Sequence, residues 1–432
     1  KNARPSQQKS VETFLKLPPD WQEKTFDSQV GDVWILSETP NFDGKNKSDF
    51  FLIAQGTGHG PAKSGMLAIE PLSSMRKPMF GLYAIHSVNL RMQFELMEML
   101  RALPTNGAPL LSTIVGATRP HSLRGIKGLT VKRTFPEKKS SILDSSLSWT
   151  EIQEIGEEVI KRFRLNEDQV EVLWRCASWL VRPLQELDLS TRRDRECVLV
   201  HGVFGSGKSY LLVALVIFLT TCADRDPSLE KLRIFICAAT NVAVDRLLES
   251  LLKDNFEDFI RVGSLKRISS KILPYSVSGS AGTDKKDAHK EAIRDCKAML
   301  RSKDLTREEE EVLHKELRAL KEGRAAERLQ RLKECRVVGA TCAACNFSVL
   351  DDLIFPILFL DESGQLIEPI SIVPVARFQC ERLLCCGDPN QLPPTLKGMK
   401  EDKLDTTLYK TLYSRLRTLG AKPTMLRTQC IL

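Results

Sequence analysis

The sequence lacks a hydrophobic run long enough to cross a membrane, and it lacks a cysteine pattern typical of a disulfide framework. Its longest apolar run covers residues 210–223, whereas a bilayer-spanning helix needs about 20 residues. The twelve cysteines are scattered, and the chain does not begin like a signal peptide. We therefore expect reduced thiols in a cytosolic or nuclear protein that has no membrane partner.

Other absences exclude further classes of protein. The six histidines are dispersed, and neither a nucleophile elbow nor a metalloprotease helix occurs. Cys342 and Cys345 have the spacing of a zinc-ligand pair, but no second pair stands at a suitable distance, so we do not expect zinc. No repeat of fixed period is present, which excludes solenoid and propeller architectures.

The composition is that of a globular protein with a mild excess of basic residues. Of 432 residues, 42% are hydrophobic and 27% are charged, so the chain can bury several cores. Lys and Arg total 63 against 55 Asp and Glu, a formal net charge of +8. This excess favours a polyanionic partner but does not establish one.

Two patterns of hydrophobicity divide the chain. Short apolar runs between turn residues predict a small β-rich module, and from about residue 150 continuous apolar runs alternate with helical patterns. The second pattern is typical of an α/β fold with a parallel sheet covered on both faces. We expect a polar tail or linker (1–28), a β-rich accessory module (29–116), a basic connector (117–150), an α/β domain in two parts (151–276 and 335–432) and an inserted, charged helical hairpin (277–334).

The strongest motif is a glycine-rich loop at residues 202–209, between an apolar strand and an apolar helix. Its glycines, Gly202, Gly205 and Gly207, allow successive backbone N–H groups to converge on phosphate oxygens, with Ser206 between them. Lys208 can then reach the β- and γ-phosphates and Ser209 can ligate Mg²⁺. The alternative, a glycine-rich turn that only caps a helix, does not explain the lysine and serine.

Polar residues end two further apolar strands. Asp361 and Glu362 follow residues 357–360, where the aspartate can hold Mg²⁺ and the glutamate can deprotonate the attacking water. Gln391 lies in a Pro-rich loop after another apolar strand and can sense the γ-phosphate. Solvated strand ends and a Pro-rich turn are the simpler readings, but they leave the grouping of these residues unexplained.

In order and spacing these segments resemble the motifs of the up-frameshift-like branch of superfamily 1 helicases, over roughly residues 30–430. Residues 165–169 resemble the adenine-reading element of that branch, with Gln169 as the adenine contact. Residues 239–245 resemble a motif that touches the nucleic-acid backbone, with Thr240 and Asn241 as the implied contacts. Residues 261–263 and 338–342 resemble the motifs that lie between it and residues 361–365, and Thr341 is taken as a further nucleic-acid contact. Longer strings, among them 201–212 and 337–345, are most similar to GRF-type zinc-finger DNA helicases.

The resemblance implies a RecA-like P-loop NTPase domain that binds ATP and Mg²⁺ and works within a 5′-to-3′ DNA helicase. The implied setting is nuclear DNA repair by homologous recombination, with single-stranded or branched DNA and recombination proteins as partners. The family pattern departs after Gln429, where Cys430, Ile431 and Leu432 replace the expected Tyr-Arg continuation. The second RecA-like domain and its arginine fingers are not in this sequence, so we expect ATP binding with turnover close to background.

Two alternatives stay open at this point. Motifs that read a nucleic-acid backbone do not choose between sugars, so an RNA helicase or an enzyme acting on RNA–DNA hybrids such as R-loops fits the same residues. A non-catalytic product that only binds nucleotide or nucleic acid fits them as well.

Overall fold

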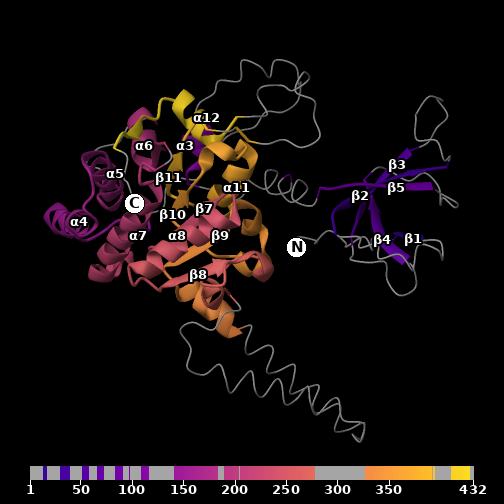
Figure 1. Ribbon diagram of the computed structural model, residues 1–432, viewed down its shortest axis with the longest axis horizontal. Helices are drawn as coiled ribbons and strands as arrows, with labels where there is room; N and C mark the ends of the chain where they lie inside the picture. The colour runs from indigo at the N-terminus through magenta and orange to yellow at the C-terminus, as the bar shows by residue number, and fades with distance from the viewer. Residues whose placement is uncertain are drawn as a thin grey trace, which may run out of the picture. The chain divides into compact units, whose positions relative to one another are not determined.

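The computed structural model describes residues 13–16, 30–38, 51–57, 66–72, 83–90, 97, 109–115, 141–182, 189–203, 205–277, 326–391, 393–394 and 410–428. The chain separates into two compact units, Lys1–Arg101 and Ala102–Leu432. Each unit is built on its own sheet (Figure 1).

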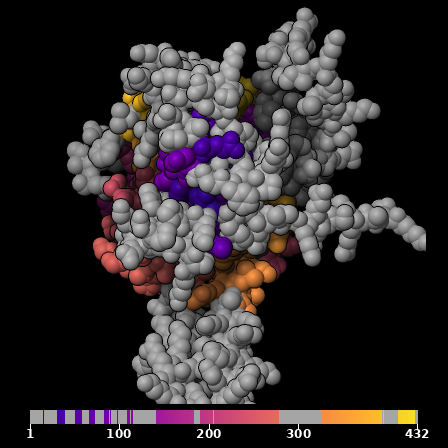
Figure 2. Space-filling model, turned by 90° about the vertical axis from the view of Figure 1, so that its right-hand side faces the viewer, coloured from indigo at the N-terminus to yellow at the C-terminus, as the bar shows by residue number. Residues whose placement is uncertain are grey.

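The first unit contains a five-stranded antiparallel sheet, which confirms the expected β-rich character of this region. Its order is β1-β4-β3-β2-β5, with strands β1 (Thr13–Lys16), β2 (Asp32–Ser37), β3 (Phe51–Gly56), β4 (Met66–Pro71) and β5 (Tyr83–Asn89). Alternate residues of β2, β3 and β4, among them Trp34, Leu52 and Leu67, form its buried cluster. The described strands of this unit have the colours at the indigo end of the bar in Figure 2.

Both ends of this unit differ from the expected boundaries. Residues 13–16 fall in the expected tail, yet they form β1, which pairs with β4 in antiparallel register from Thr13↔Ile69 to Lys16↔Met66. At the other end the unit closes at Arg101 rather than at 116. Helix α3 (Leu111–Val115) belongs to the second unit, because Thr113 Oγ1 donates a hydrogen bond to Glu196, at the end of α6 (Leu189–Glu196).

The second unit contains a seven-stranded sheet in the order β12-β6-β11-β10-β7-β9-β8, and each neighbouring pair is parallel. This confirms the predicted α/β class and the RecA-like parallel sheet. The strands are β6 (Cys197–Gly202), β7 (Ile234–Ala238), β8 (Phe259–Val262), β9 (Val337–Thr341), β10 (Ile357–Leu360), β11 (Arg382–Gly387) and β12 (Pro423–Leu426). All except β12 are buried along their whole length, as expected for strands covered on both faces.

Helices cover both faces of this sheet (Figure 1). On one face lie α4 (Trp149–Phe163), α5 (Glu167–Ala177), α7 (Lys208–Arg225) and α8 (Asn241–Lys253), and on the other lies α11 (Glu368–Arg377). Helix α7 is buried on almost every side, which explains its nearly continuous apolar sequence. Helix α12 (Leu412–Thr418) precedes β12.

The expected connector and insertion lie largely outside the described residues. Within the connector, residues 117–140 are not described, whereas Ser141 and Ile142 hydrogen-bond to Glu381, the residue before β11. Within the insertion only residue 277 and the helical residues 326–334 are described. The helical hairpin therefore stays a prediction.

Candidate functional site: the carboxyl edge of the parallel sheet

The glycine-rich loop runs from the end of β6 into the start of α7. Gly205 and Gly207 have φ angles of 80° and 78°, in the left-handed region that other residues rarely adopt. A Cβ added at Gly202 would lie 2.3 Å from Ser206 Oγ, so a larger residue there would displace the serine side chain. The loop thus reaches the first turn of α7 in a conformation that turns backbone N–H groups toward an anion.

The side chain of Lys208 folds back onto this loop. Its Nζ donates hydrogen bonds to the carbonyl oxygens of Gly202, at 2.6 Å, and Val203, at 2.9 Å. Ser206 braces the same turn, since its buried hydroxyl donates to the Val203 carbonyl oxygen at 2.8 Å. Half-buried Ser209 is the second residue of α7. A phosphate group would exchange neutral carbonyl partners of the ammonium group for charged oxygens.

Asp361 follows β10 at the same edge of the sheet. Its side chain is buried, Oδ1 accepts a hydrogen bond from the Glu362 N–H at 2.9 Å, and its own N–H donates to the Cys237 carbonyl oxygen. Burial raises the pKa of Asp361 to about 6, and the positive charge of Lys208 offsets part of that rise. The lysine and the aspartate are therefore close enough to interact electrostatically.

Glu362 has a strained backbone and an incompletely satisfied side chain. Its φ of 51° lies in the left-handed region, which costs a residue with a Cβ about 1–2 kcal/mol. Its Oε2 atom is buried and has no hydrogen-bond partner among the described residues. Such strain and such an oxygen are typical of a group that acts on a ligand.

The loop after β11 packs between the other two loops. The Asp388 carboxylate lies 3.3 Å from His201 Nε2, at the end of β6, and accepts a hydrogen bond from the Asn390 N–H. The Asp388 carbonyl oxygen accepts one from the N–H of exposed Gln391, and a Cβ on Gly364 would lie 3.1 Å from that same oxygen. The structure therefore brings the segments of Lys208, Asp361 and Gln391 together, as predicted.

Gln169 is placed near this edge but is engaged in capping its own helix. Its Oε1 accepts a hydrogen bond from the Asn166 N–H, and Asn166 Oδ1 accepts one from the Gln169 N–H, at the N-terminus of α5. The preceding residue, Asp168, accepts a hydrogen bond from the N–H of Arg427, just after β12, and β12 pairs with the end of β6. The side chain is buried, and its carbonyl oxygen already has a partner.

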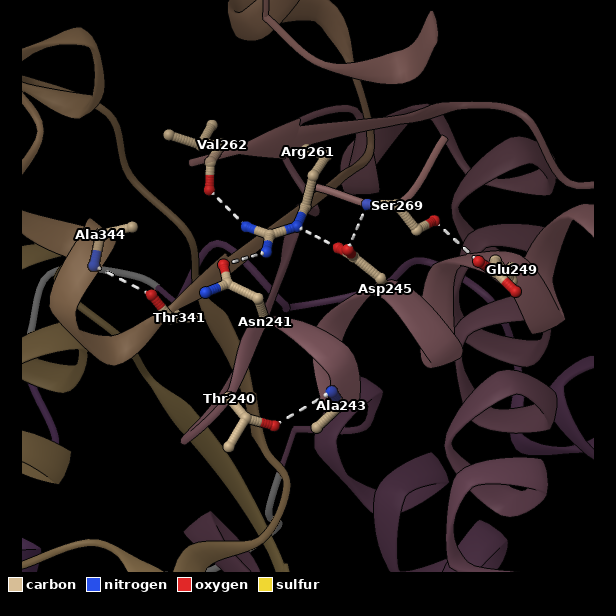
Figure 3. Close-up of polar contacts among 10 residues, drawn as sticks. All are labelled: Thr240, Asn241, Ala243, Asp245, Glu249, Arg261, Val262, Ser269, Thr341 and Ala344. Carbon is tan, nitrogen blue, oxygen red and sulfur yellow. Dashed lines mark hydrogen bonds and ion pairs between the residues drawn. The ribbon is translucent and has the colours of Figure 1, made fainter. Parts of the chain in front are cut away.

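The three residues expected to contact nucleic acid lie at the ends of β7 and β9, whose termini are paired (Ala238↔Thr341). Thr240 is exposed and caps α8 by accepting a hydrogen bond from the Ala243 N–H, and Thr341 is buried and accepts one from the Ala344 N–H (Figure 3). Asn241 is half-buried, and its Oδ1 accepts a hydrogen bond from Arg261. The edge thus groups all three residues, but Thr341 is turned into the structure.

Sequence reasoning missed two pairs at this edge. One is His201 with Asp388, and the other is Arg261 with Asp245, whose Nε–Oδ1 distance is 2.6 Å and which is buried beneath the start of α8. The available signal was a charged residue inside an otherwise apolar strand, since such a residue needs a buried partner. Among the described residues, no cluster of His, Cys, Asp or Glu has the arrangement of a metal site.

Comparison with known proteins places the chain in a family. A family model described as "AAA domain" matches residues 182–399, half of the chain, so the chain belongs to that family of AAA domains. Within this family its sequence is similar to up-frameshift-like superfamily 1 helicases. Members of this group are ATP-dependent and use Mg²⁺. No helix among the described residues is both long and apolar enough to span a membrane.

Three relatives illustrate the similarity. The 5′-3′ DNA helicase ZGRF1 of Mus musculus is 34% identical, over 96% of this chain and 22% of that protein. The regulator of nonsense transcripts 1 homolog of Drosophila melanogaster is 30% identical, over 55% of this chain and 18% of that protein. The ATP-dependent helicase NAM7 of Saccharomyces cerevisiae is 29% identical, over 55% and 22%. The chain thus spans about a fifth of the length of these relatives.

Proposed function

We propose that this chain is the N-terminal, nucleotide-binding motor domain of an ATP-dependent 5′-to-3′ DNA helicase. The observation that carries the proposal is the convergence of three loops, those of Lys208, Asp361 and Gln391, at one edge of a parallel sheet. Such an edge is where open α/β sheets bind their ligands. The similarity to a 5′-3′ DNA helicase over nearly the whole chain supports DNA as the track.

The residues present fit a magnesium–triphosphate complex. The glycine turn offers backbone N–H donors, Lys208 offers a positive charge, and the carboxylate of Asp361 offers the hard oxygen that Mg²⁺ prefers. We assign nucleotide binding to Gln169, Gly202, Gly205, Ser206, Gly207, Lys208 and Ser209. In this assignment Gln169 is the contact to the adenine.

Each polar side chain at the edge has a chemical task in this proposal. Ser209 and Asp361 would hold Mg²⁺, and a bound Mg²⁺ would supply positive charge against the phosphates. The unsatisfied Oε2 of Glu362 accepts a proton from the attacking water. Gln391 senses whether the γ-phosphate is present. Its backbone hydrogen-bonds to Asp388, so a change at Gln391 is transmitted to the loop that contacts His201.

The nucleic-acid strand would cross the ends of β7 and β9. Thr240, Asn241 and Thr341 are the assigned contacts, and the exposed start of α8 offers N–H groups to a phosphate. We infer single-stranded or branched DNA as the partner, in nuclear repair by homologous recombination and together with recombination proteins. Contacts to phosphate fix the position of the strand without reading its sequence.

The test is binding of MgATP to the chain with and without Lys208→Ala, measured by calorimetry. Loss of the charge-assisted contacts of Lys208 should weaken binding by about 100-fold, the scale of two such contacts. Lys253→Ala, an exposed lysine at the end of α8, is the matched control and should bind like the wild type. Equal affinity in all three proteins would reject the assigned site.

A second candidate is an RNA helicase or an enzyme that acts on RNA–DNA hybrids. The match to regulators of nonsense transcripts favours it, because their names point to RNA. Competition between DNA and RNA oligonucleotides of matched sequence separates the two: preferential binding of DNA supports the first candidate, and preferential binding of RNA supports the second. Binding of strand and nucleotide without strand-stimulated hydrolysis would favour the non-catalytic alternative for this chain.

A further inference from the structure

A buried ion pair lies directly beneath the start of α8, away from the glycine-rich loop. Arg261, in the short strand β8, is fully buried, and its Nε donates to Asp245 Oδ1 at 2.6 Å. The other carboxylate oxygen of Asp245 accepts a hydrogen bond from the Ser269 N–H at 2.8 Å. Ser269 Oγ in turn donates to Glu249 Oε1 on the next turn of α8 (Figure 3). The pair therefore links β8, α8 and the segment that follows β8.

The guanidinium of Arg261 also controls the side chain of Asn241. Its Nη1 donates to the Val262 carbonyl oxygen at 2.5 Å, and its Nη2 donates to Asn241 Oδ1 at 2.8 Å. A guanidinium only donates hydrogen bonds, so the amide of Asn241 must present its oxygen to Arg261. The amide nitrogen consequently points away from Arg261, toward the side on which Thr341 lies (Figure 3).

We propose that Arg261 is a positioning residue of the nucleic-acid surface, which holds the Asn241 amide with its NH₂ group toward the strand. An NH₂ group in this orientation donates to phosphate oxygens, whereas the reversed amide would present an oxygen and repel them. This inference rests on the proposed function, because it concerns the same strand-binding edge. Arg261 lies beneath this edge and does not contact the strand itself. It fixes the direction of the Asn241 amide, and that direction determines the affinity for the strand.

Stability alone gives a weak reason for a buried ion pair at this position. Burying two charges carries a desolvation cost that often cancels their attraction, and apolar side chains of similar size commonly stabilise a core as well. The backbone nearby is also fitted to the guanidinium, because a Cβ on Gly263 would lie 2.9 Å from Arg261 Nη1. What the arginine supplies and an apolar residue cannot is a directed donor for Asn241.

The first experiment changes the amide and leaves the arginine in place. Asn241→Asp keeps an acceptor for Arg261 and places a carboxylate at the start of a helix, where it is stabilising, so the thermal unfolding midpoint should not fall. A fluorescent oligothymidine should nevertheless bind at least tenfold more weakly, since a donor to an anion becomes a like charge. Asn241→Ala should weaken binding by about tenfold, less than Asn241→Asp does. Wild-type affinity in Asn241→Asp would overturn the proposal.

The second experiment changes the arginine. The single ammonium group of Arg261→Lys cannot serve Asp245, Val262 and Asn241 together. Arg261→Lys should bind the oligonucleotide about five- to tenfold more weakly than the wild type, which is the scale of one misdirected hydrogen bond. In the Asn241→Ala background the same change should weaken binding by less than about twofold relative to Asn241→Ala alone. An equal loss in both backgrounds would show that the arginine does not act through Asn241.

Two further variants separate positioning from loss of stability. Phe259→Leu destabilises the same strand β8 without touching the ion pair, so it should lower the unfolding midpoint and leave the affinity for the oligonucleotide unchanged. If Arg261→Lys fails to fold, Gly263→Ala displaces the guanidinium more gently, and it should weaken binding in the presence of Asn241 but not in the Asn241→Ala background.

The outcomes for the two proposals are distinct. If Asn241→Ala leaves the affinity unchanged, the strand does not cross α8, and the proposed function fails at this edge. If Asn241→Ala weakens binding while folded Arg261→Lys and Gly263→Ala do not, the strand site stands and the positioning role of Arg261 is wrong.

Discussion

The two halves of the sheet's carboxyl edge are prepared for their ligands in opposite ways. Along β6, β11 and β10, Lys208 is hydrogen-bonded to carbonyl oxygens of its own loop and Asp361 has a raised pKa. Glu362 keeps a buried oxygen that has no partner in the part of the chain that the structure describes. Along β7, β9 and β8, Asn241 and Arg261 are bonded to each other, and Arg261 to Asp245.

The difference indicates two modes of binding. The first half holds groups whose charge or strain costs free energy until a highly charged ligand arrives, so nucleotide and metal can change its conformation strongly. In the second half Asn241, Arg261 and Asp245 already have partners, so the proposed strand would bind there with little rearrangement. In the proposed function, the first arrangement suits a nucleotide that is repeatedly bound and released, and the second suits a nucleic-acid strand that stays bound.

Among the variants that distinguish the two halves of the sheet edge, the largest change in ligand affinity is expected from Gly207→Ala. At a φ of 78° an alanine costs about 1–2 kcal/mol and distorts the turn that aims N–H groups at phosphate, so MgATP affinity should fall by about 10- to 100-fold. Gly420→Ala is the matched control, because Gly420 has a φ of 97° and nothing within 4 Å of an added Cβ. Calorimetry should show the loss for Gly207→Ala alone, while oligonucleotide affinity should be the same in both variants.

A smaller effect, on stability, is expected from Asp361→Asn. Because burial raises the pKa of Asp361 from 3.8 to about 6, the native state binds the additional proton between these pH values, and the wild type loses stability as pH rises through that window. Asn carries no charge to desolvate, so Asp361→Asn should be more stable than the wild type by about 1–3 kcal/mol above pH 7, and no more stable near pH 4.

Urea unfolding of both proteins in metal-free buffer at pH 4, 6 and 8 checks this prediction. A constant difference across the three pH values would mean that the carboxylate is not desolvated in the native state.

The same measurement on an Asp245→Asn variant tests the contrast between the halves, because Asp245 is paired with Arg261 and its loss should destabilise the protein at pH 8.

The smallest effect is expected from Thr240→Ala. Loss of the cap on α8 should lower the free energy of unfolding by about 1 kcal/mol. Thr411→Ala removes an equivalent cap from α12 and should cost about as much, but only Thr240→Ala should weaken oligonucleotide binding. Equal oligonucleotide affinity in the two variants would remove Thr240 from the strand surface.

Much of the fold was predictable because its strands have local signatures. Strands β6, β7, β9, β10 and β11 are apolar on both faces, and that pattern requires a covered parallel sheet. Strand β12 contains a proline and has only four residues, so pairing with β6 rather than its own sequence defines it. The same is true of β1, which the sequence could not distinguish from a polar tail.

The site was predictable to the extent that its chemistry lies in contiguous motifs. The glycine turn and the two acidic residues after β10 were read directly from local sequence. Asn166 is followed three residues later by Gln169, which is the pattern of a capping box. This local signal predicts that Gln169 caps its own helix, in addition to the adenine contact that the resemblance implies. The pairing of Arg261 with Asp245 joins a strand to a helix 16 residues earlier, and only the folded chain shows it.

The contact between His201 and Asp388 restricts which substitutions related domains can accept at these two positions. His201 immediately precedes the glycine turn and Asp388 begins the loop of Gln391, so the contact between the two side chains joins these two loops. A substitution of Asp388 removes the carboxylate partner of buried His201, and a substitution of His201 leaves the Asp388 carboxylate with the Asn390 N–H. Across related chains, positions 201 and 388 should therefore covary, and an exchange of both residues together should be tolerated where either exchange alone is not.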